Sequence, residues 1–113
     1  MGLLSKIVVG KNLIDQNDAK ALIQADRKAL VLDVRTAMEY RTEHLTPSIN
    51  VDVRDKKFSN YLKNYEKDKH YIIYCRSGSR SVKAYRKMKG MGFENIYVLK
   101  GGINDWEGSR KLK

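Results

Sequence analysis

Cysteine, proline and histidine are scarce in this chain of 113 residues, which has one Cys, one Pro and two His. A single cysteine excludes an intrachain disulfide, and because the histidines stand alone there is no Cys/His spacing that would hold zinc. Apolar runs are also short: Ser5 and Lys6 break the apolar N-terminus, which is too short for a secretory core or a membrane span. We therefore expect a cytoplasmic protein without a metal, a cofactor or a membrane anchor.

Acidic residues are outnumbered, with 13 Asp and Glu against 23 Lys and Arg, so that the net charge is +10. Such an excess attracts anions, whether nucleic acid, lipid, acidic protein or small oxyanion, although a merely solvated basic surface has the same composition. The basic residues are distributed along the whole chain rather than gathered in one tail, which argues against a nucleic-acid-binding arm. We therefore expect neither nucleic acid nor a membrane as a partner, and the composition leaves the class of any other partner open.

The sequence does contain an alternation of β-rich apolar runs and helical patterns. Buried strands are expected at 29–32, 71–74 and 96–99, and a short alternating strand at 49–53. Helices are expected at 19–23, 35–43, 58–65 and 81–90, followed by a short helix bearing Trp106. The alternation predicts an α/β fold with parallel strands, whose ligands bind at the C-terminal strand ends. The length fits one domain over 1–113, with its core at about 14–106.

Cys75 lies where the apolar run 71–74 ends, and a turn of small residues separates it from a predicted helix. The loop and the helix start would direct several backbone N–H groups into one cup, and the helix dipole would add to their attraction for an anion. A thiolate there would be stabilised, with help from Arg76 and Arg80, and would be a ready nucleophile without a general base. The competing interpretation, a small core residue, does not explain why a Gly/Ser-rich turn, two arginines and a helix start coincide.

The spacing within this loop discriminates between chemistries. Protein tyrosine phosphatases place five residues between cysteine and arginine, whereas four residues separate Cys75 from Arg80. A shorter loop makes a smaller cup, which suits one terminal sulfur atom better than a phosphate group. A Cys-dependent phosphatase or arsenate reductase, which shares the strand–Cys–loop–Arg–helix plan, is therefore the weaker alternative.

Three motifs of this chain resemble those of the rhodanese family. They are Leu-Asp-Val-Arg at 32–35 with Glu39-Tyr40 and His44-Leu45, the loop Tyr-Cys-Arg-Ser-Gly-Ser-Arg-Ser at 74–81, and Leu-Lys-Gly-Gly-Ile at 99–103. The resemblance runs from about Ile14 to Trp106. At Pro47 the chain departs from the family's usual Gly-Ala pair, and because proline fixes φ the pocket edge there is not expected to keep the family's shape.

The resemblance implies a central, mostly parallel β-sheet flanked by helices on both faces, and a rhodanese-type sulfurtransferase. It implies that Cys75, as a persulfide, moves sulfane sulfur from a small anionic donor such as thiosulfate to an acceptor. The acceptor would be cyanide, a thiol or a protein, for example a thioredoxin-like one. The substrate-binding loop implied by the family consists of Arg76, Ser77, Gly78, Ser79 and Arg80, with Arg80 helping to bind the donor. The alternative is a non-catalytic or persulfide-carrying protein-binding module, and we expect a monomer.

Residues of the first motif are candidates for supporting roles. Arg35 could be an anion ligand, but a polar network of Asp33, Arg35 and Glu39 that holds the loop after the strand is favoured. His44 could move protons, but a hydrogen-bonded structural role is favoured. In the C-terminal motif, Gly101, Gly102 and Trp106 are expected to shape the turn and the core behind the Cys75 loop.

Overall fold

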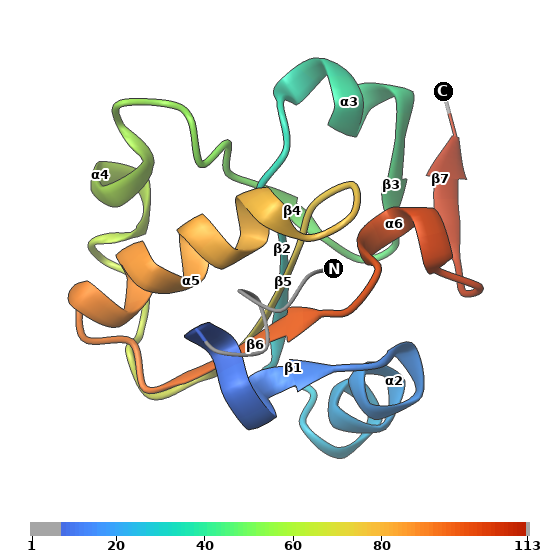
Figure 1. Cartoon of the computed structure of the whole chain (residues 1–113), viewed down its shortest axis with the longest axis horizontal. Helices are drawn as coiled ribbons and strands as arrows, with labels where there is room; N and C mark the ends of the chain where they lie inside the picture. The colour runs from blue at the N-terminus through green and yellow to red at the C-terminus, as the bar shows by residue number, and fades with distance from the viewer. Residues whose placement is uncertain (1–7, 113) are drawn as a thin grey trace.

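A five-stranded parallel sheet forms the centre of the molecule, which the computed structural model describes for residues 8–112 (Figure 1). Its strand order is β1-β6-β5-β2-β4, and each neighbouring pair runs parallel. The strands are β1 (Leu13–Ile14), β2 (Leu30–Asp33), β4 (Ile49–Asn50), β5 (His70–Tyr74) and β6 (Asn95–Leu99). The predicted parallel α/β sheet is confirmed, and β5, the strand that leads to Cys75, is its middle strand.

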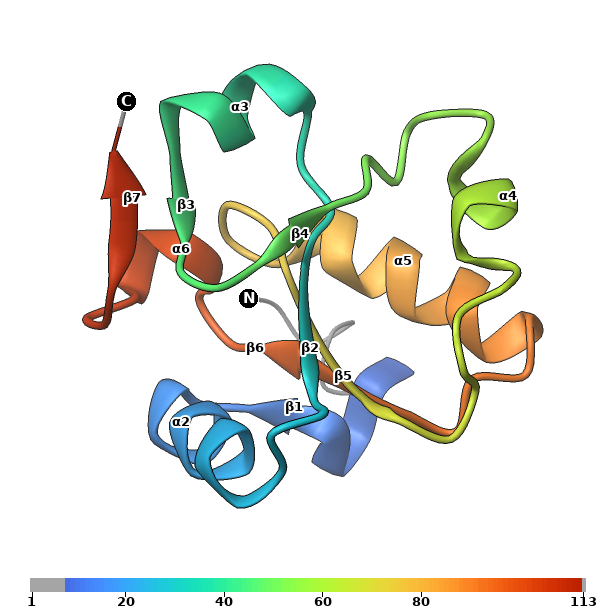
Figure 2. The same ribbon diagram turned by 180° about the vertical axis from the view of Figure 1, so that it is seen from behind.

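Helices cover both faces of this sheet, as Figures 1 and 2 show. The helical segments are η1 (Gly10–Asn12), α2 (Gln16–Ala25), α3 (Ala37–Thr42), α4 (Phe58–Leu62), α5 (Ser79–Gly90) and α6 (Gly102–Asp105). Two separate clusters of buried side chains lie against the sheet, one including residues of α4 and α5 and the other including residues of α2 and α6. The expected arrangement of helices on both faces is therefore confirmed.

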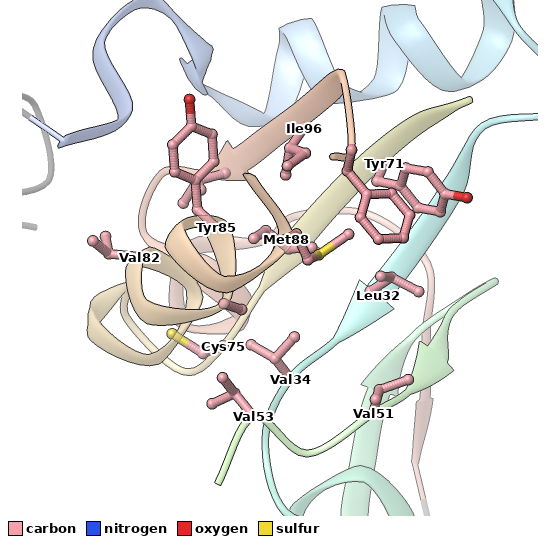
Figure 3. Close-up of a cluster of buried hydrophobic side chains, with 14 of the residues drawn as sticks. Leu32, Val34, Val51, Val53, Tyr71, Cys75, Val82, Tyr85, Met88 and Ile96 are labelled. Atoms are coloured by element: carbon pink, nitrogen blue, oxygen red, sulfur yellow. The ribbon is translucent and has the colours of Figure 1, made fainter. Parts of the chain in front are cut away.

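The side chains of β5 alternate between these two clusters. Tyr71, Ile73 and, just beyond the strand, Cys75 belong to the cluster on the α5 side (Figure 3). Ile72 and Tyr74 belong to the cluster on the α2 side. Because helices cover both faces of the sheet, residues 71–74 are all apolar instead of alternating with polar residues. Cys75 is thus the last of a row of inward-facing side chains on the α5 side.

A second sheet, which the sequence did not predict, has two antiparallel strands. β3 (Glu43–Leu45) pairs with β7 (Arg110–Leu112), and Arg110 Nη1 donates a hydrogen bond to Glu43 Oε2 at 3.0 Å. Each strand is three residues long, and 67 positions separate Glu43 from Arg110. No local pattern of hydrophobicity can indicate such a short and distant pairing.

Caps explain why two helices begin or end at other residues than predicted. Thr36 and Glu39 form a capping box, so that α3 begins at Ala37, and Glu43, expected in this helix, already belongs to β3. α5 begins at Ser79, two residues earlier than predicted, because Gly78 with a φ of 140° turns the chain directly from the loop into the helix.

Two further segments are shorter than predicted. The strand expected at 49–53 pairs with β2 only at Ile49 and Asn50. The helix expected at 58–65 ends at Leu62. Phe58 and Leu62 share its buried face, but Tyr61, predicted on the same face, is 51% exposed.

None of the helices within residues 8–112 has the length and apolar character needed to cross a bilayer. Residues 1–7, which contain the break in the apolar N-terminus that argued against a secretory core, lie outside the described residues.

Candidate active site

Cys75 lies directly after β5, at the C-terminal edge of the parallel sheet where ligand sites form. Figure 3 shows its sulfur near Val34 and Val53, beside the first turn of α5. The thiol is free of disulfides and its residue is only 1% exposed. The sulfur is therefore enclosed by its neighbours in this structure.

The loop places a backbone donor and a hydroxyl group against the sulfur of Cys75. The Gly78 N–H donates to Sγ at 3.0 Å, and Ser81 Oγ lies 3.4 Å from Sγ while donating to Gly78 O at 2.9 Å. The φ of Gly78 is 140°, which side chains other than hydrogen rarely allow, so this turn requires glycine. Among the amides of 76–80, one is hydrogen-bonded to the sulfur, fewer than the several that the sequence predicted.

Helix α6 orients the next loop amides from the far side. The Ile103 N–H donates to Cys75 O at 3.0 Å, and the Asn104 N–H donates to Arg76 O at 3.2 Å. A trans peptide holds its N–H opposite its C=O. Because these two carbonyls face α6, the amides of Arg76 and Ser77 point away from it.

A double-glycine turn makes this anchoring possible. Gly101 and Gly102 have φ values of 79° and 55° and lead the chain into α6. A Cβ on Gly102 would lie 2.3 Å from the carbonyl oxygen of Cys75, closer than side chains come to backbone. Trp106, directly after α6, is buried in the cluster on the α2 side. These residues lie behind the Cys75 loop, where the sequence analysis expected them.

Arg80, the last residue of the predicted loop, is held by Glu39 of α3. Its Nη1 and Nη2 atoms donate to Oε1 and Oε2 of Glu39 at 2.6 and 3.0 Å. Two parallel, charge-assisted hydrogen bonds of this kind are strong and directional. The Arg80 guanidinium holds the pKa of Glu39 at about 2, below its usual value of 4.5. Arg80 was expected to bind an anionic donor, but in this structure its fork is engaged by a carboxylate of the same chain.

Asp33 and Arg35 form a buried ion pair below the loop. Arg35 is 5% exposed, and its Nη2 lies 2.6 Å from Asp33 Oδ2 while also donating to a backbone carbonyl of β3. The Tyr74 hydroxyl donates to the same Asp33 oxygen at 2.6 Å, and burial together with this bond raises the pKa of Tyr74. Asp33 and Arg35 pair with each other as in the favoured polar network, but Glu39, which was expected in it, pairs with Arg80 instead.

Two other residues of interest contact elements away from the sulfur. His44 Nδ1 lies 2.7 Å from Tyr40 O, and the two rings stack with their centroids 3.7 Å apart. These contacts correspond to the structural role favoured for His44. Pro47 lines a small apolar recess on the α2 side, to which residues 75–80 contribute nothing. The position at which the chain departs from the family pattern is therefore separate from the Cys75 loop.

A hollow in the surface lies between α3 and the Cys75 loop. It is lined by Arg35, Thr36, Met38, Glu39, Thr42, Glu43 and Arg76. Arg76 is exposed and Met38 is 70% exposed, so the rim presents a cation and an apolar side chain to solvent.

No role was predicted for Met38 or for Ser81 from the sequence. Nothing in the pattern marks an exposed methionine on a short helix. The contact between Ser81 and the thiol depends on α5 beginning at Ser79, two residues before the predicted start.

Comparisons with known proteins agree with this geometry. The family model described as Rhodanese-like domain matches residues 15–109. Over 94 residues the chain is 31% identical to the putative sulfurtransferase YtwF of Bacillus subtilis, covering 83% of this chain and 88% of that protein. A crystal structure of a rhodanese-related protein from Thermoplasma volcanium has a TM-score of 0.75 at 29% identity, covering 89% of this chain and 98% of that one.

Other relatives are longer proteins. The chain is 37% identical over 115 residues to a tRNA uridine(34) hydroxylase of Pelagibacter ubique, covering 100% of this chain and 38% of the hydroxylase. It likewise spans 23% and 26% of the next two curated relatives.

Proposed function

Since the chain belongs to the rhodanese-like domain family, we propose that it is a sulfurtransferase that carries sulfane sulfur as a persulfide on Cys75. The observation that carries the proposal is the hydrogen bond from the Gly78 N–H to Sγ at the end of the central strand. A buried thiol that served packing alone would have no need of a strained glycine turn directing an amide at its sulfur. The Bacillus subtilis relative, named as a putative sulfurtransferase, aligns over most of its length.

With thiosulfate as donor, the reaction has two steps. The Cys75 thiolate attacks the outer sulfur of thiosulfate, a new S–S bond forms, and sulfite leaves with the electron pair of the broken S–S bond. Cyanide or a thiolate then attacks the terminal sulfur of the persulfide, which gives thiocyanate or a new persulfide and returns Cys75 as a thiolate. Both steps leave negative charge on sulfur at the loop, so preorganised N–H donors there lower both barriers.

The loop offers further donors to a second sulfur attached to Sγ. The amides of Arg76 and Ser77 point away from α6 because their neighbouring carbonyls are anchored on it. The amides of Ser79 and Arg80 open α5, and the first amides of a helix have no acceptor within it. A terminal persulfide anion would thus be held by main-chain groups rather than by a charged side chain.

The hollow between α3 and the loop is the proposed approach for donor and acceptor. Arg76 lies on its rim, is exposed and follows Cys75 directly, so it attracts an anionic donor. Met38 adds an exposed apolar contact suited to a protein that presents an acceptor thiol. Arg80 acts on the site through its position, because Glu39 holds its side chain.

Incubation with thiosulfate followed by intact mass spectrometry tests the proposal. Wild-type protein is expected to gain the mass of one sulfur atom, and cyanide is expected to remove it with release of thiocyanate. Cys75→Ala is the matched control and should gain nothing. A wild-type protein that stays unmodified, or an equal gain in the control, would refute the persulfide. Cys75-dependent hydrolysis of an aryl phosphate in the same preparation would favour phosphatase chemistry instead.

A second candidate function rests on the Pelagibacter ubique relative. We propose as an alternative that the chain supplies the rhodanese-like part of a tRNA-modifying protein, because identity to that tRNA uridine(34) hydroxylase extends along the whole chain. Nucleoside analysis of tRNA from cells that lack the chain tests this alternative. Uridine modification that is unchanged without the chain counts against it.

A further inference from the structure

The positive charge of this chain is concentrated on one side of the fold, although it is dispersed along the sequence. Segments 52–63 and 79–90 contain nine Lys and Arg and two Asp, a net charge of +7, whereas the other 89 residues carry +3. These segments form α4 with the turn before it, and α5, whose buried side chains share the cluster on one face of the sheet (Figures 1 and 2). The even distribution of basic residues along the sequence was the reason for expecting no nucleic acid. That reason does not hold in the folded chain, where most of the excess charge lies on one side.

Eight of the nine basic side chains are exposed. They are Arg54, Lys56, Lys57, Lys63, Lys83, Arg86, Lys87 and Lys89, which together we call the α4–α5 basic surface. Within residues 8–112 none of the eight forms an ion pair with a carboxylate. The two acids of the segments, Asp52 and Asp55, each accept a backbone N–H through Oδ1, at 2.9 and 2.8 Å, within tight turns. The surface is thus of one sign and internally uncompensated.

Lys87 joins the two halves of this surface. Its Nζ donates to Val53 O at 3.5 Å and lies 5.7 Å from the centroid of the Phe58 ring, so a cation of α5 lies over the segment that leads into α4. The surface also reaches the candidate active site. α5 begins four residues after Cys75, and Figure 3 shows Val53 next to Cys75.

An exposed aromatic residue belongs to the same segment, 52–63, as four of these cations. Tyr61 is on α4, between Lys57 and Lys63 in sequence, and it is 51% exposed while Phe58 and Leu62 of the same helix are buried. An exposed aromatic ring on a basic surface offers a face on which an unpaired base can stack while the cations contact phosphates.

We propose that the α4–α5 basic surface binds single-stranded nucleic acid, with phosphates along its lysines and arginines and a base on Tyr61. Six of the eight cations are lysines, a residue type depleted in protein–protein interfaces but common in phosphate contacts. The surface has no exposed acids, so it suits a partner that carries only negative charge, and a phosphate backbone is such a partner. Tyr61 favours unpaired bases over a duplex. The binding does not depend on the persulfide at Cys75.

Fluorescence anisotropy with labelled oligouridylate and oligothymidylate of about 12 nucleotides tests the proposal and separates RNA from DNA. Wild-type protein is expected to bind at low salt and to lose affinity steeply as salt rises. The triple variant Lys56→Gln, Lys57→Gln, Lys83→Gln should bind at least about tenfold more weakly, with a log–log salt slope smaller by about 2. Tyr61→Ala should lose roughly fivefold or more, and Tyr61→Phe should bind like wild type.

Matched controls make the outcome decisive. Lys11→Gln, Lys28→Gln, Lys100→Gln removes three exposed cations outside the surface, and Met38→Ala removes another exposed apolar side chain. Both controls should bind like wild type, and all variants are checked by thermal unfolding. Absence of binding at low salt, equal loss in the two triple variants, full affinity in Tyr61→Ala, or tighter binding of polyglutamate than of either oligonucleotide would overturn the proposal. Cys75→Ala should bind normally and the surface triple variant should still load sulfur, so failure of one proposal is distinguishable from failure of the other.

Discussion

Arg80 and Glu39 join the first turn of α5 to the first turn of α3 through two parallel hydrogen bonds of 2.6 and 3.0 Å. The arginine that ends the Cys75 loop is therefore neutralised within the chain. Its guanidinium ties the start of α5 to α3, the helix that lines the hollow beside the loop. In this arrangement Arg80 shapes the site, whereas the exposed Arg76 is the cation that a donor meets.

Breaking this pair should loosen the loop. Glu39→Gln is expected to lower the free energy of unfolding by about 1 kcal/mol, since the pair is partly exposed, and to slow sulfur loading of Cys75. Thermal unfolding and mass spectrometry measure the two effects. Glu66→Gln is the control, because it breaks the exposed pair with Lys69 before the start of β5, away from the hollow, and should leave sulfur loading unchanged. Equal loading rates in Glu39→Gln and wild type would contradict the role of the pair.

The same pair gives the stability a defined dependence on pH. The pKa of Glu39 is about 2 in the folded protein, below its ordinary value of 4.5, so ionised Glu39 stabilises the fold above pH 4.5. This stabilisation is lost as the pH falls from there towards 2. The difference in unfolding free energy between wild type and Glu39→Gln is therefore expected to be constant from about pH 7 to 5 and to shrink below that. A difference that is as large at about pH 2.5 as at pH 7 would contradict this assignment.

Gly102→Ala should damage the site without touching the sulfur. Its Cβ would lie 2.3 Å from Cys75 O at a φ of 55°, so the loop or α6 must move, at a cost of about 3 kcal/mol. Sulfur loading is expected to fall with the displaced loop. The matched control is Gly90→Ala at the end of α5, which meets no atom within 4 Å and should be neutral or stabilising by up to about 1 kcal/mol. Comparable stability of the two variants would argue against the α6 anchor.

Ser81 should act on the sulfur through its hydroxyl group. Ser81→Ala removes the oxygen 3.4 Å from Sγ and the bond to Gly78 O, and it is expected to slow sulfur loading roughly tenfold. The loss of stability should be about 1 kcal/mol. Ser79→Ala, an exposed serine in the same turn, serves as the control and should load at the wild-type rate. If both variants load alike, the hydroxyl has no part in the reaction.

Substitutions of Arg35 and Arg76 should have different effects, because we assign a structural role to Arg35 and a donor-binding role to Arg76. Arg35→Ala leaves Asp33 buried without its cation and is expected to lower the unfolding free energy by about 3–5 kcal/mol. Arg76→Ala, on the exposed rim, should keep the stability and instead raise the thiosulfate concentration needed for half-maximal loading. Denaturant unfolding and loading titrations measure the two. The assignment of roles fails if Arg35→Ala is as stable as wild type while loading thiosulfate poorly.

The features that could be predicted from the sequence are those with a local signal. Residues 71–74 of β5 are all apolar because helices cover both faces of the sheet, and this run ends at Cys75, so the strand, the thiol and the turn at Gly78 could be predicted from the sequence. α5 could also be predicted, because its buried residues recur at helical spacing in the sequence.

Contacts between residues that are far apart in the sequence could not be predicted, because no local sequence pattern indicates them. Glu39 and Arg80 are 41 residues apart, and Glu39 could equally have joined the nearby Arg35 on sequence grounds. The same holds for β3 and β7. The basic surface belongs to this class as well, because its cations come from two segments that only the fold brings to one face.

The anchoring of the Cys75 and Arg76 carbonyls on Ile103 and Asn104 has a consequence for folding. Until α6 has packed against the loop, these two bonds cannot hold the orientation of the peptide groups that follow Cys75. Competence to carry sulfur is thus acquired only when a segment of the chain outside the loop has reached its folded position.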